Sequence, residues 1–324
     1  MTNERPLPPD PPRAWTVAIP AKNEALRVEG CLDALDRAAA RCALPVTALV
    51  LANDCTDATA ALCGRAARRL RHVRVAVAAV ALTSGEAHAG GARRRAAREA
   101  LRRSLAAPDD LLLTTDADAR LAPDALAAME AAFARGADLV LARIDCIADP
   151  FDPVPQAVLD WGTPQVLWRY RVRQLAETFR TGALADPRCH DDYGGAGLAA
   201  RVGAYRALGG FPSVRSEEDL RFVRAADAAG LRVDRSSGAR VEVLARATGR
   251  AEGGMATALA ANAANLARRA PRLVERHDLT VARLRRDPAP ARVFCPAPDA
   301  VEPVEDAIRG LDGVLSRYAS GARA

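Results

Sequence analysis

The sequence has no long apolar run, little aromatic character and almost no lysine. No stretch approaches the ~20 consecutive apolar residues that span a bilayer, so a transmembrane helix is not expected. Phe, Trp and Tyr together make up 4% of the chain, and none lies within the Arg-rich segment 93–103, where base stacking would need them. Lys22 is the only lysine. The net charge of +6 therefore reflects a general Arg and Ala bias better than selection for a polyanionic partner.

Metal-binding cysteine pairs are absent as well. The seven cysteines are scattered and none forms a Cys-x-x-Cys pair, so zinc is not expected. The N-terminal residues MTNERPLPPDPPR have neither the apolar core of a signal peptide nor an Arg- and Ser-rich amphipathic pattern. We therefore expect a cytoplasmic protein with reduced thiols.

What the sequence does have is an alternation of short apolar runs with longer amphipathic ones. This pattern predicts strands over Thr16–Pro20, Val46–Ala52, Val73–Val77, Leu111–Thr115 and Leu139–Ile144. It predicts helices near 24–40, 57–71, 90–106 and 123–135, with Asp57 and Pro123-Asp124 at two helix starts. Such an order favours an α/β fold with a mostly parallel sheet and helices on both faces.

The pattern changes after Asp145. The segment 149–195 holds a long helical stretch and the aromatic residues Trp161, Trp168 and Tyr170. These aromatics fit a core or an acceptor platform equally well. Further on, 200–230 and 254–270 look helical, 240–245 looks like a strand, and a linker from about 283 precedes a helix at 302–318.

The sharpest local feature is Asp116-Ala117-Asp118 directly after an apolar strand. If the backbone there is extended, residues two apart point to one side and the two carboxylates converge. Converging carboxylates are hard ligands for Mg²⁺ or Mn²⁺, which would in turn hold a diphosphate. The competing interpretation is a pair of turn aspartates that cap the next helix.

Other polar residues follow the neighbouring strands. The first strand runs into Pro20-Ala-Lys-Asn-Glu24, and the second ends at Asn53-Asp54. Parallel strands place such ends on one edge of the sheet, where ligands bind in open α/β folds. Gly90-Gly91 would let backbone approach a ligand, and Arg93 stands at a helix start that suits a phosphate.

In this combination and order the chain resembles the family 2 glycosyltransferases of the GT-A fold, over roughly residues 15–250. The matching features are Pro20 to Glu24, the acidic turn after the second strand, the Gly/Arg helix start, Asp116 to Asp118, and the later GGFPSVRSEEDLRFV segment. The resemblance implies an inverting, nucleotide-sugar-dependent transfer of a single sugar to an unidentified acceptor.

The resemblance also implies residue roles. Asp118 and Asp116 would hold Mn²⁺ or Mg²⁺, with Asp116 also near the donor ribose. The donor-binding residues would be Pro20, Asn23, Glu24, Asn53, Asp54, Arg93 and Asp116. Asp219, or else Glu218, would be the general base that deprotonates the acceptor. Gly195, Gly197, Asp191 and Asp192 would lie beside the acceptor.

Each of these residues has a structural alternative. Ser216 with Asp219 resembles a capping box, and Arg246 and Arg250 fit surface or capping positions as well as diphosphate contacts. The second strand ends in Ala52-Asn53 where the family usually has two aspartates. The Gln-x-x-Arg-Trp motif of processive members is absent, which favours single-sugar transfer. His190 and His277 stand in no metal-binding motif, and we leave both out of the metal site.

Three other functions compete with this interpretation. The Gly195–Ala200 segment matches a G-x-G-x-x-A dinucleotide pattern, but no apolar strand precedes it. A nucleotidyltransferase would share the sheet and the metal, and a nucleic-acid-binding module would use the Arg-rich helix. We expect no nucleic-acid partner, while peripheral contact with a membrane is left open.

The domain organisation predicted from these features has four parts. Residues 1–14 form a disordered Pro-rich lead-in, and 15–148 form the nucleotide-sugar-binding half. Residues 149–282 form the acceptor and catalytic half of the same domain, and 283–324 form a linker and C-terminal helix.

Overall fold

The structure is a computed structural model, and it describes residues 11–192, 194–249, 254–288 and 298–321. The described residues form two compact units. The first unit comprises the chain up to Phe151 together with Asp192–Ala245, and most of the second comprises Asp152–Asp191 and the described chain from Met255 onward. Residues 192–245, which the sequence assigns with 149–191, therefore pack with the N-terminal part of the chain.

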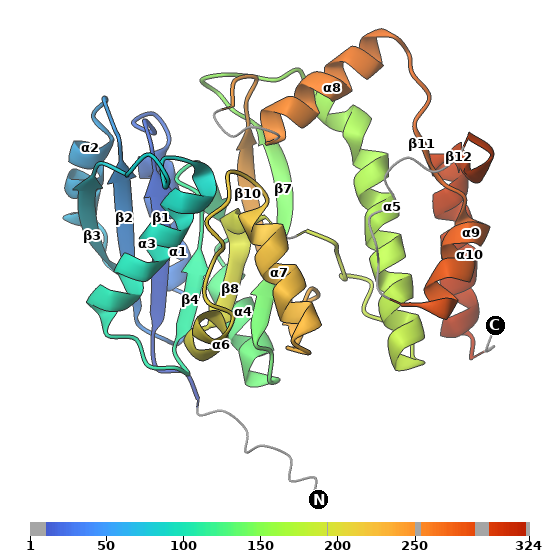
Figure 1. Cartoon of the computed structure of the whole chain (residues 1–324), viewed down its shortest axis with the longest axis horizontal. Coiled ribbons are helices and arrows are strands. Elements are labelled where there is room, and N and C mark those ends of the chain that lie inside the picture. Colours follow the sequence, from blue (N-terminus) through green and yellow to red (C-terminus); the bar gives the residue numbers. More distant parts are fainter. Residues whose placement is uncertain (1–10, 193, 250–253, 289–297, 322–324) are drawn as a thin grey trace, which may run out of the picture. The chain divides into compact units, whose positions relative to one another are not determined.

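The first unit is built on a seven-stranded sheet with the order β3-β2-β1-β4-β8-β6-β9 (Figure 1). Neighbouring strands β1, β2, β3 and β4 run parallel, whereas β8 is antiparallel to both β4 and β6. The strands are β1 (Trp15–Ala21), β2 (Val46–Asn53), β3 (Val73–Val80), β4 (Leu111–Thr114), β6 (Leu139–Leu141), β8 (Leu198–Arg201) and β9 (Val233–Asp234). The predicted mostly parallel α/β fold is confirmed.

Helices cover both faces of this sheet. They are α1 (Val28–Ala39), α2 (Thr59–Ala67), α3 (Ala89–Ser104), α4 (Ala125–Ala134), α6 (Val202–Ala207) and α7 (Glu218–Ala228). Strand alternation sends Ala18 of β1 into one core with α3, α6 and α7, and Trp15 to the other face, 6.0 Å from the ring of Phe133 on α4. Both residues are fully buried.

An aromatic cluster fixes helix α7 against the sheet. The ring centroids of Phe211 and Phe222 are 4.9 Å apart, and Tyr205 lies 5.4 and 5.5 Å from these two rings. Aromatic pairs at these separations contribute about 0.5–1.5 kcal/mol each beyond their burial. The cluster therefore anchors the helix whose first residues, Glu218 and Asp219, are candidate site residues.

One predicted strand proves to be two. The expected strand Leu139–Ile144 breaks at Ala142, whose amide donates to the carbonyl of Gly197 at 2.8 Å. Beyond the break the chain enters a second sheet, order β5-β10-β7, formed by β5 (Ala119–Leu121), β10 (Arg240–Ala245) and β7 (Arg143–Ala148). The prediction of one strand here was wrong because continuous apolar character does not show which sheet a residue joins.

The second unit is mainly helical. It contains α5 (Gln156–Thr181), α8 (Met255–Ala267), α9 (His277–Arg286), α10 (Val304–Ala319), an antiparallel pair of β11 (Leu273–Glu275) and β12 (Val301–Pro303), and the short 3₁₀ turn η2 (Pro298–Ala300). Its core joins α5, α9 and α10, and Trp168 packs against both of its hydrophobic clusters. Trp168 is therefore a core residue, while Tyr170 meets His190 edge-on at 6.0 Å.

Several other expectations need correction or lie outside the described residues. The helix expected over 200–230 is two helices, α6 and α7, separated by a loop, and the linker expected from about 283 is helical up to Arg286 in α9. The side chain of Asp124, at the start of α4, makes no capping hydrogen bond. Residues 1–10 of the lead-in, Arg250 and Cys295 lie outside the described residues. Within the described chain no helix is long and apolar enough to cross a membrane.

Candidate functional site

The polar residues predicted at the strand ends lie on one edge of the first sheet. Strands β1, β2 and β4 are parallel neighbours, so their carboxyl ends and the loops that follow them point the same way. We call this edge, with the loops after these three strands, the rim. Pro20 lies inside β1, opposite Leu51 of β2.

The loop after β1 is locked to the loop after β2. Asn23 has a φ of 52°, a left-handed conformation that asparagine tolerates better than most residues. Its Oδ1 accepts a hydrogen bond from the amide of Thr56 at 2.8 Å. The amide of Glu24 donates to the Thr59 hydroxyl at 2.8 Å, and the Glu24 side chain is buried 3.7 Å from Arg27. Both predicted donor residues thus also shape the rim.

Asp57, next to Thr56, reinforces the same junction. Burial alone would raise the pKa of Asp57, but hydrogen bonds from the hydroxyl and amide of Thr59 and the amide of Ala25 lower it below its usual value. Asp57 was predicted to begin a helix, and it does so by holding Thr59 at the start of α2. These three bonds favour the ionised form of Asp57.

The end of β2 turns sharply into its loop. Asp54 has a φ of 48°, and its Oδ1 accepts from the amide of Leu82 at 3.0 Å. Asn53 is buried, with its Nδ2 3.4 Å from Asp54 Oδ2. The loops after β2 and β3 are therefore joined through Asp54. A role for either residue in base recognition stays a prediction.

The acidic segment after β4 is not extended as the sequence argument assumed. Strand β4 ends at Thr114, and the amide of Ala119 donates to the carbonyl of Asp116 at 3.0 Å, which closes a turn. Strand alternation therefore does not make the carboxylates of Asp116 and Asp118 converge. The two carboxylates nevertheless lie near one thiol: burial raises the pKa of Cys31, and the charges of Asp118 and then Asp116 raise it further. Asp118 is buried, whereas the side chain of Asp116 is 34% exposed.

Arg93 of α3 connects the rim to two other segments. From the first turns of α3 its Nε donates to Glu218 Oε1 at 2.8 Å, its Nη1 to the Gly195 carbonyl at 2.9 Å and its Nη2 to Asp116 Oδ1 at 2.8 Å. The Arg93 side chain is only 8% exposed. Burial would lower the pKa of Arg93, but Asp116 and Glu218 outweigh it and raise the pKa. The guanidinium therefore stays charged and joins three segments that are distant in sequence.

Asp219 lies beside this cluster. Its Oδ2 accepts from the amide of Gly195 at 2.8 Å and its Oδ1 from the amide of Leu220 at 2.7 Å. Burial is the main cause that raises the pKa of Asp219, Glu218 adds to it, and Arg93 opposes it. The first-turn position does not make a capping box, because the N-cap residue of α7 is Glu217, with a φ of 61° and no side-chain cap bond. A half-buried carboxyl with a raised pKa suits a general base.

The glycine-rich loop before β8 packs against this cluster. Gly195–Gly197 forms a short 3₁₀ turn, η1, that leads into β8 and not into a helix. The dinucleotide pattern therefore lacks the helix that its chemistry needs. A Cβ on Gly195 would lie 2.1 Å from Cζ of Arg93, and one on Gly197 would lie 2.7 Å from Cβ of Ala142. Close protein packing is what requires these two glycines.

The other predicted acceptor residues are divided between the units. Asp192 Oδ2 accepts from the amide of Ile144 at 2.9 Å in the first unit. Asp191 belongs to the second unit and pairs with Arg173 at 2.6 Å. The structure thus places Asp192 with β7 and Asp191 with α5. Their acceptor roles stay predictions.

Sequence reasoning missed two contacts that shape the site. Thr114, the last residue of β4, donates from its hydroxyl to the Gly195 carbonyl at 2.7 Å. Gly90 was expected to face a ligand, yet a Cβ there would lie 2.2 Å from the carbonyl oxygen of Val214. Gly90 therefore allows α3 to approach the chain just before α7. No local sequence signal identifies either contact.

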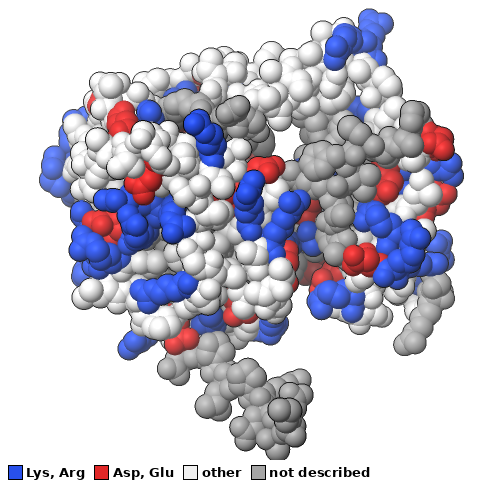
Figure 2. Space-filling view, viewed as in Figure 1, with Lys and Arg blue, Asp and Glu red and all other residues white. Residues whose placement is uncertain are grey.

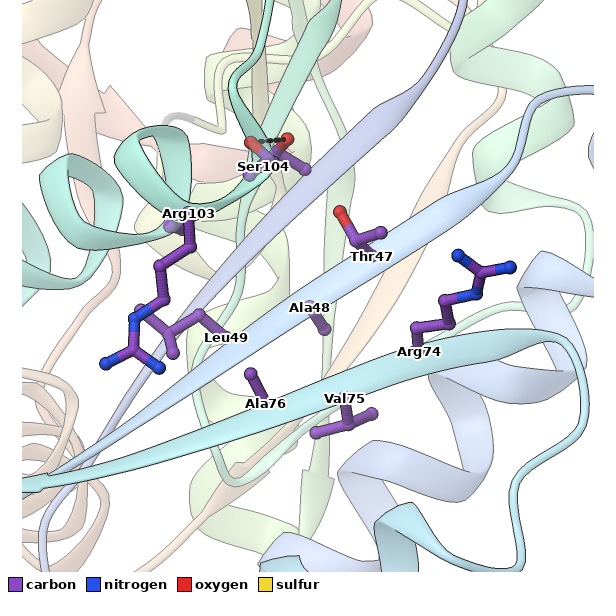
Figure 3. Close-up of a pocket in the computed structure, with 10 residues that line it drawn as sticks. Thr47, Ala48, Leu49, Arg74, Val75, Ala76, Arg103 and Ser104 are labelled. Carbon is purple, nitrogen blue, oxygen red and sulfur yellow. Dashed lines mark hydrogen bonds between the residues drawn. The ribbon is translucent and has the colours of Figure 1, made fainter.

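A cavity of about 250 Å³ lies elsewhere on the first unit (Figure 3). Thr47 of β2 and Arg74 of β3 line it near the beginnings of their strands, with Arg103 and Ser104 from the end of α3. The rim is at the opposite ends of these strands. The cavity is therefore separate from the carboxylates and is not part of the candidate site.

The Arg-rich helix α3 does not present a uniform basic surface. Arg93 is buried in the rim, and Arg102 and Arg103 both pair with Glu99 on the same helix. Figure 2 likewise shows acidic side chains among the basic ones on the face it displays. These contacts pair three of the six arginines of segment 93–103 with carboxylates.

The comparisons with known proteins agree with the fold. The sequence matches the family model described as glycosyl transferase family 2 over residues 16–193, more than half of the chain. The structure is similar to the mannosyltransferase PcManGT from Pyrobaculum calidifontis, solved with GDP-Man and Mn²⁺, at 18% identity over 97% of this chain and 85% of that chain, with a TM-score of 0.50. It is also similar to S. aureus TarS 1–349, at 14% identity over 72% of this chain and 60% of that chain, with a TM-score of 0.45.

The same TarS fragment in complex with UDP-GlcNAc matches at 15% identity over 75% of this chain and 60% of that chain, with a TM-score of 0.43. The chain thus spans about 60% of the length of the TarS fragment. None of the curated proteins compared with the sequence matches it.

A mostly parallel sheet between helical layers, with the architecture of PcManGT, defines a GT-A fold. The chain belongs to glycosyl transferase family 2.

Proposed function

We propose that the protein transfers a single sugar from a nucleotide-sugar donor to an acceptor hydroxyl, with inversion at the anomeric carbon. One observation carries the proposal: Asp219, a half-buried carboxyl with a raised pKa, is held beside the Arg93 cluster of a family 2 fold. The hydroxyl oxygen would attack the anomeric carbon while Asp219 takes its proton and the nucleoside diphosphate leaves. The donor bound by PcManGT, GDP-Man, supports a nucleotide sugar as the donor class.

Asp116 and Asp118 are the residues that would hold a divalent cation. Their carboxylates are hard oxygen donors in the turn after β4, and both act on the pKa of Cys31. Mg²⁺ or Mn²⁺ is commonly held by one or two carboxylates together with substrate phosphates. Among the described residues no group of three or more Cys, His, Asp and Glu side chains could hold a metal ion. The Mn²⁺ in the PcManGT complex supports a divalent cation. When bound, the cation would offset charge on the departing diphosphate.

The donor-facing surface would be formed by the rim loops. Pro20 in β1, Asn23 and Glu24 in the loop after it, and Asn53 and Asp54 at the end of β2 would line the nucleoside pocket. Gly195, Gly197 and Asp192 would lie nearer the acceptor. Asp191 belongs to the second unit, and its acceptor role stays a prediction. The rigid junction between the loops after β1 and β2 supports a preformed pocket, which lowers the ordering cost of binding.

The first test is donor binding. Thermal unfolding would be measured with UDP-, GDP- and dTDP-sugars, with and without Mn²⁺, for the wild type, Asp118→Ala and the control Asp124→Ala, whose side chain is exposed. A ligand at about a hundred times its dissociation constant adds about 2.7 kcal/mol of stability. We expect a Mn²⁺-dependent shift with one nucleotide class in the wild type and the control, lost in Asp118→Ala. A shift in melting temperature that is the same without Mn²⁺ and the same in Asp118→Ala would refute the metal assignment.

A further inference from the structure

We propose that Arg93 is a positioning residue that holds the general base in register with the acidic turn after β4, and that it is not a ligand of the donor diphosphate. The inference rests on the proposed function and deepens it. It concerns how Asp116, on the donor side, and Asp219, on the acceptor side, keep a fixed separation although they lie in segments far apart in the sequence.

The contacts of Arg93 point inward. Three of its N–H groups donate to Glu218, Gly195 and Asp116, each at 2.8 or 2.9 Å. A guanidinium is a planar fork whose donors have fixed angles, so three simultaneous partners fix the positions of three segments. A lysine ammonium at the same place would supply charge without that geometry. With 8% of its side chain exposed, Arg93 presents little surface to a diphosphate.

Gly195 connects Arg93 to Asp219 through hydrogen bonds of its own backbone. The carbonyl of Gly195 accepts from Arg93 at 2.9 Å and from the Thr114 hydroxyl at 2.7 Å. The amide of the same residue donates to Asp219 Oδ2 at 2.8 Å. Glu218, the neighbour of Asp219, accepts a hydrogen bond from Arg93 Nε. Asp219 is thus held from both sides by groups that Arg93 fixes.

The backbone around the Arg93 side chain packs so closely that only glycine fits at two positions. A methyl group on Gly195 would lie 2.1 Å from the guanidinium carbon of Arg93, and one on Gly90 would lie 2.2 Å from the carbonyl of Val214 and 3.2 Å from Cβ of Glu218. The start of α3 is itself anchored, because Nδ1 of His88 accepts from the amide of Gly91 at 3.0 Å. The starts of α3 and α7 are therefore held together around Arg93.

The decisive experiment separates turnover from donor binding in Arg93→Lys. The matched control is Arg94→Lys, since Arg94 is the next residue of α3 and donates to a backbone carbonyl, that of Phe211. The dissociation constants of UDP and GDP with Mn²⁺ would be measured by calorimetry. Turnover would be followed as release of nucleoside diphosphate from the matching nucleotide sugar with water as the acceptor.

A positioning role predicts that kcat falls at least about 100-fold in Arg93→Lys, because a shift of about 1 Å at a reacting group has an effect of that size. KM and the dissociation constant of the nucleoside diphosphate would stay within about threefold, since ground-state binding is untouched. Arg94→Lys would leave all three unchanged. Weaker nucleoside diphosphate binding with kcat intact would overturn the inference and make Arg93 a diphosphate ligand.

A second variant changes the contact between Gly195 and Arg93 while leaving the arginine in place. Gly195→Ala places a methyl group against the guanidinium carbon and is expected to lower kcat as Arg93→Lys does, with binding retained. Its control is Gly64→Ala, because a methyl group there meets no atom within 4 Å. Normal turnover in a folded Gly195→Ala protein would contradict the proposed role of the contact between Gly195 and Arg93.

One readout needs no donor at all. The Gly195 amide, held by Asp219, should exchange its hydrogen at least about tenfold faster in Arg93→Lys than in the wild type or Arg94→Lys. Unchanged exchange would refute the positioning role by itself. Absence of any nucleotide binding in the wild type would instead refute the proposed function, so the two failures are distinguishable.

Discussion

The two ends of helix α3 carry arginine–carboxylate clusters of the same chemistry in opposite surroundings. At the N-terminal end Arg93 is 8% exposed and bonds to Glu218 and Asp116. At the C-terminal end Arg102 is 69% exposed and shares Glu99 with Arg103. Hydrogen bonds from these two arginines lower the pKa of Glu99 to about 2, yet water and salt screen such exposed pairs. Burial, and not the residue types, makes the first cluster structurally decisive.

The largest expected effect is on turnover and comes from replacing Asp219, beside the Arg93 cluster. Asp219→Asn should lower turnover by about 10²- to 10⁴-fold, the usual contribution of a general base. Wild-type activity should fall as Asp219 is protonated, and because its pKa is raised, this loss should occur above the pH of about 4 that is typical of an aspartate. Release of nucleoside diphosphate measured against pH checks both statements.

The control for that measurement is Asp227→Asn. Asp227 lies on the same helix, is 45% exposed and pairs with Arg235, so its substitution should leave turnover unchanged. If the two variants lose activity equally, Asp219 is not the base, and its surroundings give it no functional advantage over the exposed Asp227.

The next effect concerns stability. Arg93→Met removes the cation from the buried cluster and leaves Glu218 without its partner, which should lower the free energy of unfolding by about 3–5 kcal/mol. Urea denaturation followed by circular dichroism measures this loss. A decrease below about 1 kcal/mol, the size seen for surface pairs, would show that water reaches the cluster.

A smaller effect of opposite sign is expected for Asp219→Asn. Because the pKa of Asp219 is raised in the folded protein, the folded state binds this proton more tightly than the unfolded state. Its contribution to stability is present below the unfolded pKa of about 3.9 and is lost as the pH rises through the folded value. The asparagine variant lacks this loss. Its melting temperature should equal that of the wild type near pH 4 and exceed it near pH 7; a lower value at pH 7 would contradict the pKa direction.

The smallest effect belongs to the exposed end of α3. Arg102→Met should leave the melting temperature unchanged at physiological salt, since Arg103 still pairs with Glu99 and the site is screened. Thermal unfolding at low and high salt is the measurement. If Arg102→Met destabilises the protein as much as Arg93→Met does, burial does not distinguish the two ends of the helix.

Much of the sheet could be predicted because strand and helix periodicity is local. The strands near 16–20, 46–52, 73–77 and 111–115 are all present. The break at Ala142 could not be predicted, since it depends on the Gly197 carbonyl, which lies in another segment. The extended backbone assumed for Asp116 to Asp118 was wrong for a related reason: an i to i+3 hydrogen bond closes a turn there.

The candidate site shows the same division. The motif pattern of the sequence identified Asp116, Asp118, Glu218 and Asp219 as candidate residues together, but it assigned Arg93 to phosphate and Gly90 to a ligand. Only the folded chain shows that Arg93 faces Glu218 and Gly195 and that Gly90 faces Val214. Their partners are more than a hundred residues away, and periodicity carries no information about such pairs.

The sequence by itself determined the alternation of strands and helices, the membership in glycosyl transferase family 2 and the residue types at the rim. These follow from local propensity, side-chain periodicity and motif order. The tertiary structure decided which charges are buried, which carbonyls the guanidinium of Arg93 meets and how Asp219 is held. The physical reason is that the pKa of a carboxyl and the value of an ion pair depend on burial and on distances between remote segments.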